Sequence, residues 1–230
     1  GDLLAYTLDA TGFQEFTLYV KDLRTGAVLS ETIPHVAGCV WAADNRTLFY
    51  ITEDDAKRGY RLWRHELGAK NDTLVYEEKD ALFNLGIGRS RSKAYVFAES
   101  ASKTSTEVRY LHADQPGGEW QIVAPREKDH EYDVDHAGDL FYIRTNDKGR
   151  NFRLVTTPAT DPRRENWQEL VPHRDDVMLE NVTLFAQHYV LEERADGLPQ
   201  LRVVEIANGK STPIQIPEPS YALAPEENAV

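Results

Sequence analysis

Cysteine, basic charge and long apolar runs are all scarce in this chain of 230 residues. Its single cysteine, Cys39, excludes an internal disulfide framework and is typical of a reducing compartment, so we expect a cytoplasmic protein. No apolar run approaches the ~18 residues of a membrane span, and the first residues lack the basic and apolar regions of a signal peptide. With 26 Lys and Arg against 38 Asp and Glu, the net charge of −12 argues against nucleic acid, whose phosphates need a basic surface.

The residues that are abundant predict one large all-β domain. Hydrophobic residues make up 41% of the chain and aromatic residues 10%, which is enough to bury a core. Residues 128–154 show the structural period: an apolar strand, a turn at 138–139, a second strand over 140–144, a polar loop, and a third strand that opens at Phe152. This succession of strands is a β-meander.

The chain repeats this meander. The centres of the second strands are separated by 42, 47, 46 and 48 residues, at Tyr6, Leu48, Tyr95, Phe141 and Tyr189. The centres of the third strands are separated by 44, 47, 45 and 48 residues, at Tyr19, Trp63, Tyr110, Val155 and Val203. A period of about 40 to 50 residues that carries about four strands is typical of propeller blades. The sequence therefore predicts an all-β fold, a β-propeller of antiparallel four-stranded meanders with almost no helix.

Both ends of the chain fall inside a meander in this interpretation. The first residues already form a second strand, and residues 220–230 begin a further first strand. We therefore expect about five blades, cut within a blade at each end. A propeller is normally a closed ring, because closure protects the edges of its strands. Residues 1–230 are accordingly expected to be one partial propeller domain of a longer polypeptide.

Three groups of polar residues resemble functional sites in composition, and geometry argues against each. His130 and His136 are about 20 Å apart on an extended strand, and the carboxylates between them face the other side, so one tetrahedral metal cannot gather them. Residues 146–149 echo a calcium loop but lack its later glutamate. Residues 88–92 lack the second glycine of a G-x-S-x-G nucleophile elbow. We predict a structural role for His130, plain turns in the other two segments, and no metal or cofactor.

The tryptophans offer one further candidate site. We predict that they lie within strands and pack between blades, and a stacking site for a ligand is the alternative. They are Trp41, Trp63, Trp120 and Trp167.

A resemblance to a known family extends over essentially the whole chain. The phrases that carry it are TGFQEFTLYVKDLRTG, VWAADNRTLFY, LWRHELG, LVYEEKD, STEVRYL, PREKDHEYDVDH, NDKGRNFRL, VMLENVTLF and VLEERADGL. They occur in order at the blade spacing and include polar residues, such as Arg64, His65 and His130, that propeller packing does not require. In these phrases the chain resembles the N-terminal β-propeller of the oligopeptidase B group in the prolyl oligopeptidase family.

The resemblance implies a seven-bladed propeller packed on a C-terminal α/β-hydrolase domain of the same polypeptide. Together the two would form a cytosolic serine peptidase that cleaves short peptides after Arg or Lys. The propeller would gate and orient the substrate and exclude folded proteins. No catalytic residue is expected in this chain, since the family's catalytic triad and its acidic specificity residues are implied to lie in the hydrolase domain.

The candidate site is the propeller face that would look toward that hydrolase domain. Meander geometry places on one face the loops between second and third strands and the segments that join one blade to the next. The resemblance implies that residues 34–38 are on this face, and several joining segments are acidic, which would concentrate basic peptides. The residues assigned to this channel or interdomain face are Val36, Glu78, Asp80, Asp129, Glu131 and Asp176, with Glu77 and Asp175 beside them. The alternative is that these acids form a solvated rim.

Two other classes of function were weighed. A stand-alone propeller acting as a protein-interaction module is compatible with the repeats, but WD-type and kelch signatures are absent. A glycosidase or lactonase propeller needs convergent carboxylates or a metal, which the spacing does not reveal. The downstream sequence discriminates, because a peptidase needs several hundred further residues with a nucleophile elbow.

Overall fold

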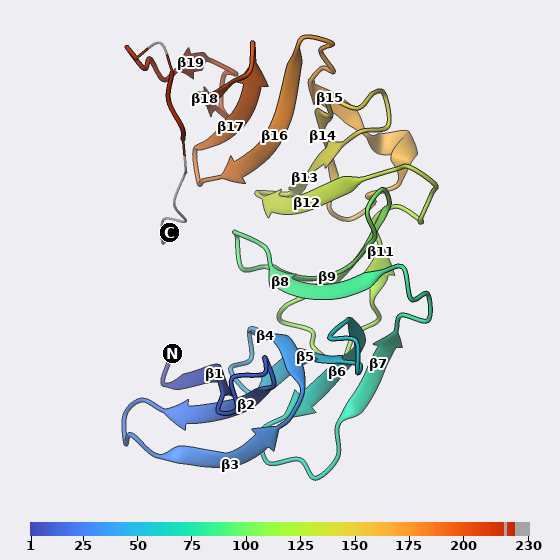
Figure 1. Cartoon of the computed structure of the whole chain (residues 1–230), viewed down its shortest axis with the longest axis vertical. Helices are drawn as coiled ribbons and strands as arrows, with labels where there is room; N and C mark the ends of the chain where they lie inside the picture. The colour runs from blue at the N-terminus through green and yellow to red at the C-terminus, as the bar shows by residue number, and fades with distance from the viewer. Residues whose placement is uncertain (219, 224–230) are drawn as a thin grey trace. The chain divides into compact units, whose positions relative to one another are not determined.

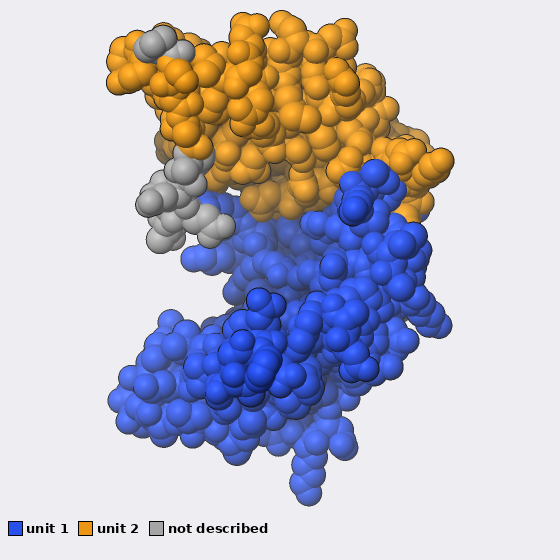
Figure 2. Space-filling view, viewed as in Figure 1, with its two compact units in different colours: residues 1–125 blue, residues 126–230 orange. Residues whose placement is uncertain are grey.

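The computed structural model describes residues 1–218 and 220–223 (Figure 1). These residues form 19 strands and one short 3₁₀ helix. Within the described part, no helix is long and apolar enough to cross a membrane. The chain divides into two compact units, residues 1–125 and 126–230 (Figure 2).

Unit 1 contains three antiparallel meanders in which consecutive strands pair. The first has three strands: β1 (Leu3–Asp9), β2 (Phe16–Asp22) and β3 (Val28–Ile33). The second has four: β4 (Val36–Trp41), β5 (Thr47–Glu53), β6 (Gly59–Glu66) and β7 (Thr73–Glu77). The third also has four: β8 (Asn84–Arg89), β9 (Tyr95–Ala101), β10 (Thr106–His112) and β11 (Gln121–Ile122).

Unit 2 contains two meanders of four strands each. The fourth meander of the chain comprises β12 (Tyr132–Ala137), β13 (Leu140–Thr145), β14 (Arg153–Pro158) and β15 (Gln168–Val171), with the 3₁₀ helix η1 (Arg164–Asn166) before β15. The fifth comprises β16 (Val177–Leu184), β17 (His188–Ala195), β18 (Leu198–Glu205) and β19 (Ser211–Pro213).

The meander repeat predicted from the sequence is confirmed. The five aligned second-strand residues lie in β1, β5, β9, β13 and β17, and the third-strand residues lie in β2, β6, β10, β14 and β18. In the first meander the two aligned residues, Tyr6 and Tyr19, are direct register partners, and their stacked rings are 5.6 Å apart. A further strand was predicted to begin within residues 220–230: residues 220–223 are not in a strand, and residues 224–230 lie outside the described residues.

The apolar cores lie between neighbouring meanders of a unit. In unit 1 the second meander is covered on both sides, so successive residues of β5, Leu48, Phe49, Tyr50 and Ile51, are all buried although alternate side chains point to opposite faces. Leu48 and Tyr50 pack with residues of β2, whereas Phe49 and Ile51 pack with residues of β9 and β10. In unit 2 the core forms between the fourth and fifth meanders, from Leu154 on β14 to Leu191 on β17.

Two of the four tryptophans depart from the prediction that they lie within strands. Trp41 and Trp63 are in β4 and β6 and pack on the core between the first two meanders. Trp120 precedes β11, and its ring meets Phe49 edge-on at 5.3 Å, so it also packs between meanders. Trp167 follows η1 and donates from its indole nitrogen to the carbonyl of Pro162 (2.9 Å). Both exceptions sit in connections that polar residues dominate, where an aromatic residue does not by itself indicate a strand.

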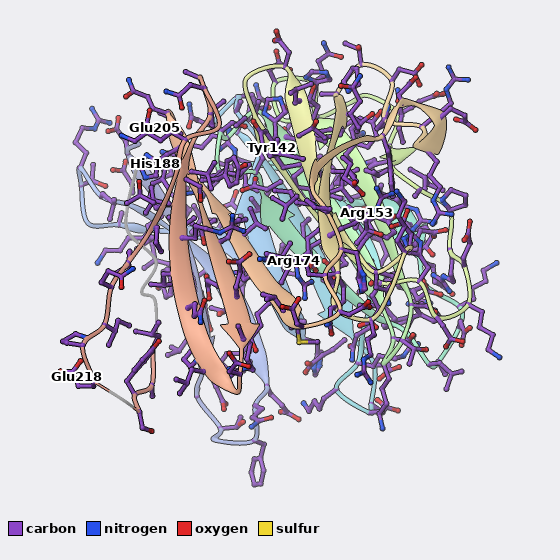
Figure 3. The ribbon with its side chains drawn as sticks, turned by 90° about the horizontal axis from the view of Figure 1, so that it is seen from above. Tyr142, Arg153, Arg174, His188, Glu205 and Glu218 are labelled. Atoms are coloured by element: carbon purple, nitrogen blue, oxygen red, sulfur yellow. The ribbon has the colours of Figure 1, made fainter. Side chains whose placement is uncertain are left out.

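The third strand of four meanders carries an arginine that is paired with a carboxylate of its own meander. The arginines are Arg61, Arg109, Arg153 (labelled in Figure 3) and Arg202. Their carboxylate partners are Glu77, Glu107, Asp147 and Glu193 respectively. Burial of the pairs varies: the Arg61 and Glu77 side chains are 38% and 32% exposed, but those of Arg153 and Asp147 only 8% and 15%.

Candidate functional site: the loop face

In unit 1 three connections lie together at one end of the strands. They are the β1–β2 loop (residues 10–15), the β5–β6 loop (54–58) and the segment 78–83 that joins β7 to β8. Lys57 of the second connection reaches Glu15 in the first, with Nζ and Oε1 3.8 Å apart. We call this surface the loop face of unit 1, and we use the same name within unit 2 for the surface that the corresponding connections form there. It is the face that meander geometry predicted.

Arg58 fixes the joining segment to the β5–β6 loop. Its Nη1 donates to the carbonyl oxygens of Glu78, Asp80 and Phe83 at 3.3, 3.2 and 3.1 Å. Its Nε is held by Asp54 at 2.9 Å. One guanidinium therefore sets the path of the connection between two meanders, because an arginine presents several donors in a rigid plane.

The three predicted site residues of unit 1 differ in exposure. Val36, the first residue of β4, is 1% exposed and belongs to the core. Glu78 is 3% exposed, and its carboxylate accepts hydrogen bonds from the Tyr76 hydroxyl and from the Asp80 amide, both at 3.0 Å. Asp80 is exposed and accepts from the amide of Leu82 at 3.0 Å. Of the three side chains, only that of Asp80 is available to a molecule approaching from solvent.

In unit 2 asparagines of the β13–β14 loop organise the loop face. Asn146 accepts from the amide of Glu131 at 2.9 Å and donates to its carboxylate and to the carbonyl of Asp129. Asn151 donates to the carbonyls of Arg174 and Asp175, each at 2.9 Å. The side chains of Asp129 and Asp176 are exposed and that of Glu131 is half-buried. Within each unit the predicted acids thus lie on connections of the same face, and within unit 2 the β13–β14 loop links them.

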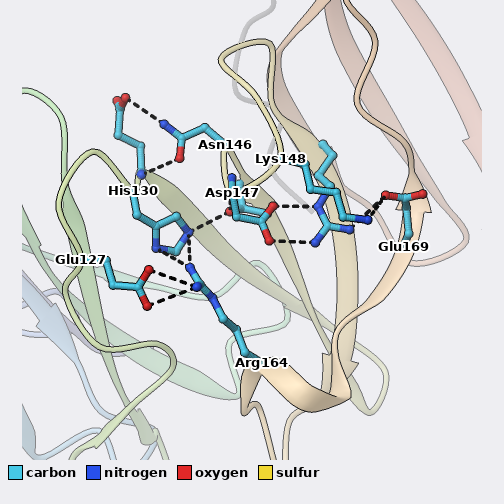
Figure 4. Close-up of polar contacts among 10 residues, drawn as sticks. Glu127, His130, Asn146, Asp147, Lys148, Arg164 and Glu169 are labelled. Carbon is cyan, nitrogen blue, oxygen red and sulfur yellow. Dashed lines mark hydrogen bonds and ion pairs between the residues drawn. The ribbon is translucent and has the colours of Figure 1, made fainter.

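Next to these acids, unit 2 contains a network of ion pairs (Figure 4). Arg153 binds Asp147 through two bonds of 2.7 and 2.8 Å and also binds Glu169 at 3.0 Å. Arg164 binds both carboxylate oxygens of Glu127 at 3.1 Å. Two of the acids near the loop face, Asp147 and Glu127, are therefore neutralised by arginines.

His130 lies within this network. It is 4% exposed, its Nε2 is 2.9 Å from the Thr145 hydroxyl, and its Nδ1 is 2.9 Å from Nη2 of Arg164. Burial, and secondarily the positive charge of Arg164, lower the pKa of His130 from its ordinary value. The ring stacks on Tyr132 with centroids 5.1 Å apart. The structural role predicted for His130 is confirmed.

Residues 146–149 form a turn, as predicted, whereas the segment 88–92 is a turn only after Arg89. Gly88 and Arg89 end β8, and Ser90 is 3% exposed and accepts from the amide of Tyr95 across the following turn. In residues 146–149 the carboxylate of Asp147 is occupied by Arg153. No group of three His, Cys, Asp or Glu suited to a metal occurs among residues 1–218 and 220–223.

One histidine–carboxylate pair could be mistaken for part of a catalytic triad. His65 Nδ1 is 2.7 Å from Asp72, which also accepts from the Tyr50 hydroxyl. The other ring nitrogen of His65 is buried without a hydrogen-bond partner, so no serine hydroxyl is positioned to give it a proton. This arrangement ties β5 and β6 to the connection before β7 and has no nucleophile.

Comparison with known proteins now identifies the family. The chain matches the family model described as prolyl oligopeptidase, N-terminal β-propeller domain, over residues 1–228. The chain belongs to the prolyl oligopeptidase family. The predicted fold class, a β-propeller of antiparallel meanders, and the predicted resemblance to oligopeptidase B are confirmed.

Similar proteins of this family are peptidases by name. The chain is 41% identical over 231 residues to dipeptidyl aminopeptidase BI of Pseudoxanthomonas mexicana, with 98% of this chain and 32% of that protein covered. It is 34% identical to protease 2 of Moraxella lacunata, with 96% and 32% covered. The structure of oligopeptidase B from Leishmania major superposes with a TM-score of 0.86 at 27% identity, covering 95% of this chain and 32% of that one. The chain thus spans about a third of the length of these relatives.

The residues that sequence reasoning missed are those that hold the loops of the propeller domain. Arg58, Asn146 and Asn151 determine where the joining segments run. An asparagine or arginine inside a turn next to a strand was the available signal, because buried carbonyls of a connection need donors. Which distant carbonyl receives the bond depends on packing between meanders, and the local sequence does not contain that information.

Proposed function

We propose that this chain is the propeller part of a two-domain serine peptidase that cleaves short peptides after Arg or Lys. Its location would be the cytoplasm, and its partners would be the C-terminal α/β-hydrolase domain of the same polypeptide and short basic peptides. The observation that carries the proposal is the family match over residues 1–228, together with the likeness to oligopeptidase B. In this role the chain supplies no catalytic group. It positions and filters the substrate.

The loop face supports a role in substrate capture through its charge. Asp80 is exposed on the loop face of unit 1, and Asp129 and Asp176 on that of unit 2, where lysines such as Lys79 and Lys128 are exposed as well. The whole chain carries a net charge of −12, and a net negative surface raises the local concentration and the association rate of basic ligands. A peptide that contains Arg or Lys is the matching ligand. Selection by size would come from the narrow access that a propeller leaves, which excludes folded proteins.

The activity test compares the chain with the full-length polypeptide encoded by its gene. We expect the full-length protein to hydrolyse amino-terminally blocked Arg- and Lys-amide reporters, and a serine-directed inhibitor to abolish turnover. The 230-residue chain alone should be inactive, because it has no nucleophile elbow. Inhibitor-sensitive turnover by the chain alone, or a full-length protein that prefers neither Arg nor Lys, would refute the proposal.

A second candidate activity is favoured by the relative that is 41% identical, whose name is dipeptidyl aminopeptidase BI. Such an enzyme removes dipeptides from a free amino terminus. Paired reporters with the same Arg-amide bond, one with a blocked and one with a free amino terminus, distinguish the two activities. Comparable kcat/KM for both supports the endopeptidase proposal, and turnover of the free form alone supports the exopeptidase.

The acids of the loop face make a prediction about charge. In the full-length enzyme the triple change Asp80→Asn, Asp129→Asn and Glu131→Gln should lower kcat/KM a few-fold for peptides with several basic residues. Coulomb attraction between exposed charges is only about 1 kcal/mol at contact in water and is screened over about 8 Å at physiological salt. The loss should therefore spare kcat, be small for peptides with one basic residue, and fade as salt is raised.

A matched control removes equal charge at the opposite end of the strands. Asp114, Glu119 and Asp139 are exposed and lie in connections at that end. The change Asp114→Asn, Glu119→Gln and Asp139→Asn should leave kcat/KM nearly unchanged. Equal losses in the two triple variants would show that total charge acts rather than the loop face. No loss in either variant would show that these acids form a solvated rim without a role in substrate capture.

A further inference from the structure

Two large apolar side chains stand out in solvent on the loop face of unit 1. Phe13 in the β1–β2 loop is 76% exposed, and Leu82 in the segment before β8 is 79% exposed. The next most exposed large apolar side chains of the described part, Leu23 and Val28, are each 53% exposed. Scattered apolar residues on a surface need no explanation, but the two most exposed ones of the described part lie on connections of one face, which does.

The loop that carries Phe13 is held in one conformation. The carboxylate of Asp9 accepts from the amides of Thr11, Gly12 and Gln14, each at 2.9 Å. These bonds, that from Thr11 first among them, lower the pKa of Asp9 to about 2. The amide of Phe13 itself donates to the Thr11 hydroxyl at 3.1 Å. The aromatic ring is therefore presented by an ordered loop.

Leu82 is presented in the same manner. Its amide donates to the carboxylate of Asp80, and Arg58 binds the carbonyls of residues on both sides of it. The adjacent Phe83 is only 6% exposed. The segment thus buries the side chain of Phe83 and directs that of Leu82, the residue before it, into solvent.

The two loops belong to one surface. The β5–β6 loop lies between them, and it reaches the first through Lys57 and Glu15 and the second through Arg58. Both loops carry carboxylates: Asp9 accepts from the amide of Gln14, next to Phe13, and Asp80 accepts from the amide of Leu82, while Lys57 and Arg58 lie in the loop between them. A surface that fits them would offer apolar pockets with a basic rim.

We propose that Phe13 and Leu82 are docking side chains that insert into the hydrolase domain of the same polypeptide. This rests on the proposed function, and its occupant is argued from chain length: the matched part is 32% of each of two relatives, so about two thirds of each relative lies outside it and offers surface for such a contact. Phe13 and Leu82 anchor the contact, and the surrounding carboxylates meet Lys or Arg on the other domain.

The test measures the chemical accessibility of cysteines placed at these positions. In a Cys39→Ser background, Phe13→Cys, Leu82→Cys and Leu23→Cys are made both in the 230-residue chain and in the full-length protein. Leu23 follows β2 at its far end from Phe13, and so controls for exposure without the loop face. All three thiols should react quickly in the chain. In the full-length protein, positions 13 and 82 should react at least tenfold more slowly, and position 23 at an unchanged rate.

The outcomes separate this inference from the proposed function. Equal rates in the two proteins at positions 13 and 82 overturn the docking proposal, even if the same preparation cleaves Arg-amides. Protection in a full-length protein that shows no peptidase activity supports docking and refutes the activity. Protection in the chain alone that grows with its concentration means that a second copy covers these side chains, which also overturns the proposal.

Discussion

Replacing Gly59 by alanine is expected to lower the free energy of unfolding by about 3 kcal/mol, at the upper end of the usual range for overpacking. Gly59 is the buried first residue of β6, where the second meander approaches the third. A Cβ added there would lie 2.4 Å from the carbonyl oxygen of Leu85 and 3.0 Å from a methyl group of Ile51. The carbonyl belongs to the β8 backbone and cannot turn aside as a side chain could, so the two strands must separate.

Urea denaturation followed by tryptophan fluorescence measures this loss. For a domain of this size, about 3 kcal/mol corresponds to a fall of about 6 to 12 °C in Tm. Gly88→Ala is the matched control, because Gly88 lies in β8 and a Cβ there meets nothing within 4 Å. Similar stabilities for the two variants would show that β6 and β8 leave enough space for a methyl group at residue 59, which would contradict the prediction.

Replacing Arg153 by methionine is expected to cost about 3 to 5 kcal/mol, the usual result of removing one partner from a buried ion pair. Methionine keeps the length of the side chain but removes both bonds to Asp147 and the bond to Glu169. The carboxylate of Asp147, only 15% exposed, would then be left without its cation. The double variant Arg153→Met/Asp147→Asn should be more stable than the single one, since it removes the unpaired charge.

Arg163→Met provides the control for the loss of Arg153. Arg163 binds Asp161 through two bonds of 2.6 Å, but its side chain is 74% exposed. Exposed pairs contribute little because water and salt screen them, so this variant should unfold close to the wild-type midpoint. If both methionine variants lost the same stability, burial would not be what makes the Arg153 pair important.

Acid should act on the same pair. Despite burial, which raises it, the pKa of Asp147 is lowered overall by the hydrogen bonds and charge of Arg153. Its contribution to stability is therefore present above the pKa of the unfolded chain and is lost as pH falls through the lower folded value. Stability measured from pH 5 downward should fall less steeply in Arg153→Met/Asp147→Asn than in the wild type.

The repeat could be predicted because each meander has its own local pattern of strand and turn residues. Strand alternation and turn residues depend on neighbours, so the prediction for residues 128–154 differs from β13 and β14 by one residue at most. The sequence was less informative about which residues of the third meander point toward its neighbours. Trp63 and Tyr110 were aligned, yet Trp63 packs toward the first meander, whereas it is Leu111, the neighbour of Tyr110, that packs toward the second.

Aligning the third strands on their arginines would have predicted correctly which residues share a face. The strings YRLW and VRYL place Arg61 and Arg109 in register, and Trp63 then coincides with Leu111. A shift of one residue matters because it exchanges the two faces of a strand. Apolar residues occur on both faces of a covered meander, so their pattern alone could not fix the register, whereas a polar residue on one face could.

The candidate site was predictable as loops and less so as side chains. Meander topology places Asp80 and Asp129 on joining segments, and both are exposed there. It could not show that Glu78 is buried against Tyr76, because the path of the segment depends on the bonds that its carbonyls accept from Arg58, which lies in a different loop. Phe13 gave no signal of its role either, since an exposed aromatic residue is recognisable only after its surroundings are known.

The pairing of each third-strand arginine within its own meander bears on how such a chain can evolve. Arg61, Arg109, Arg153 and Arg202 each find a carboxylate that the same sheet or its loop supplies. Duplicating, deleting or exchanging a blade between genes then moves a cation together with its counter-ion. A transplanted blade would not leave an unpaired buried charge in its new neighbour. Blades that differ widely in sequence can accordingly be recombined, with their apolar faces and the contacts of Arg58 and Asn151 to the joining segments left to adjust.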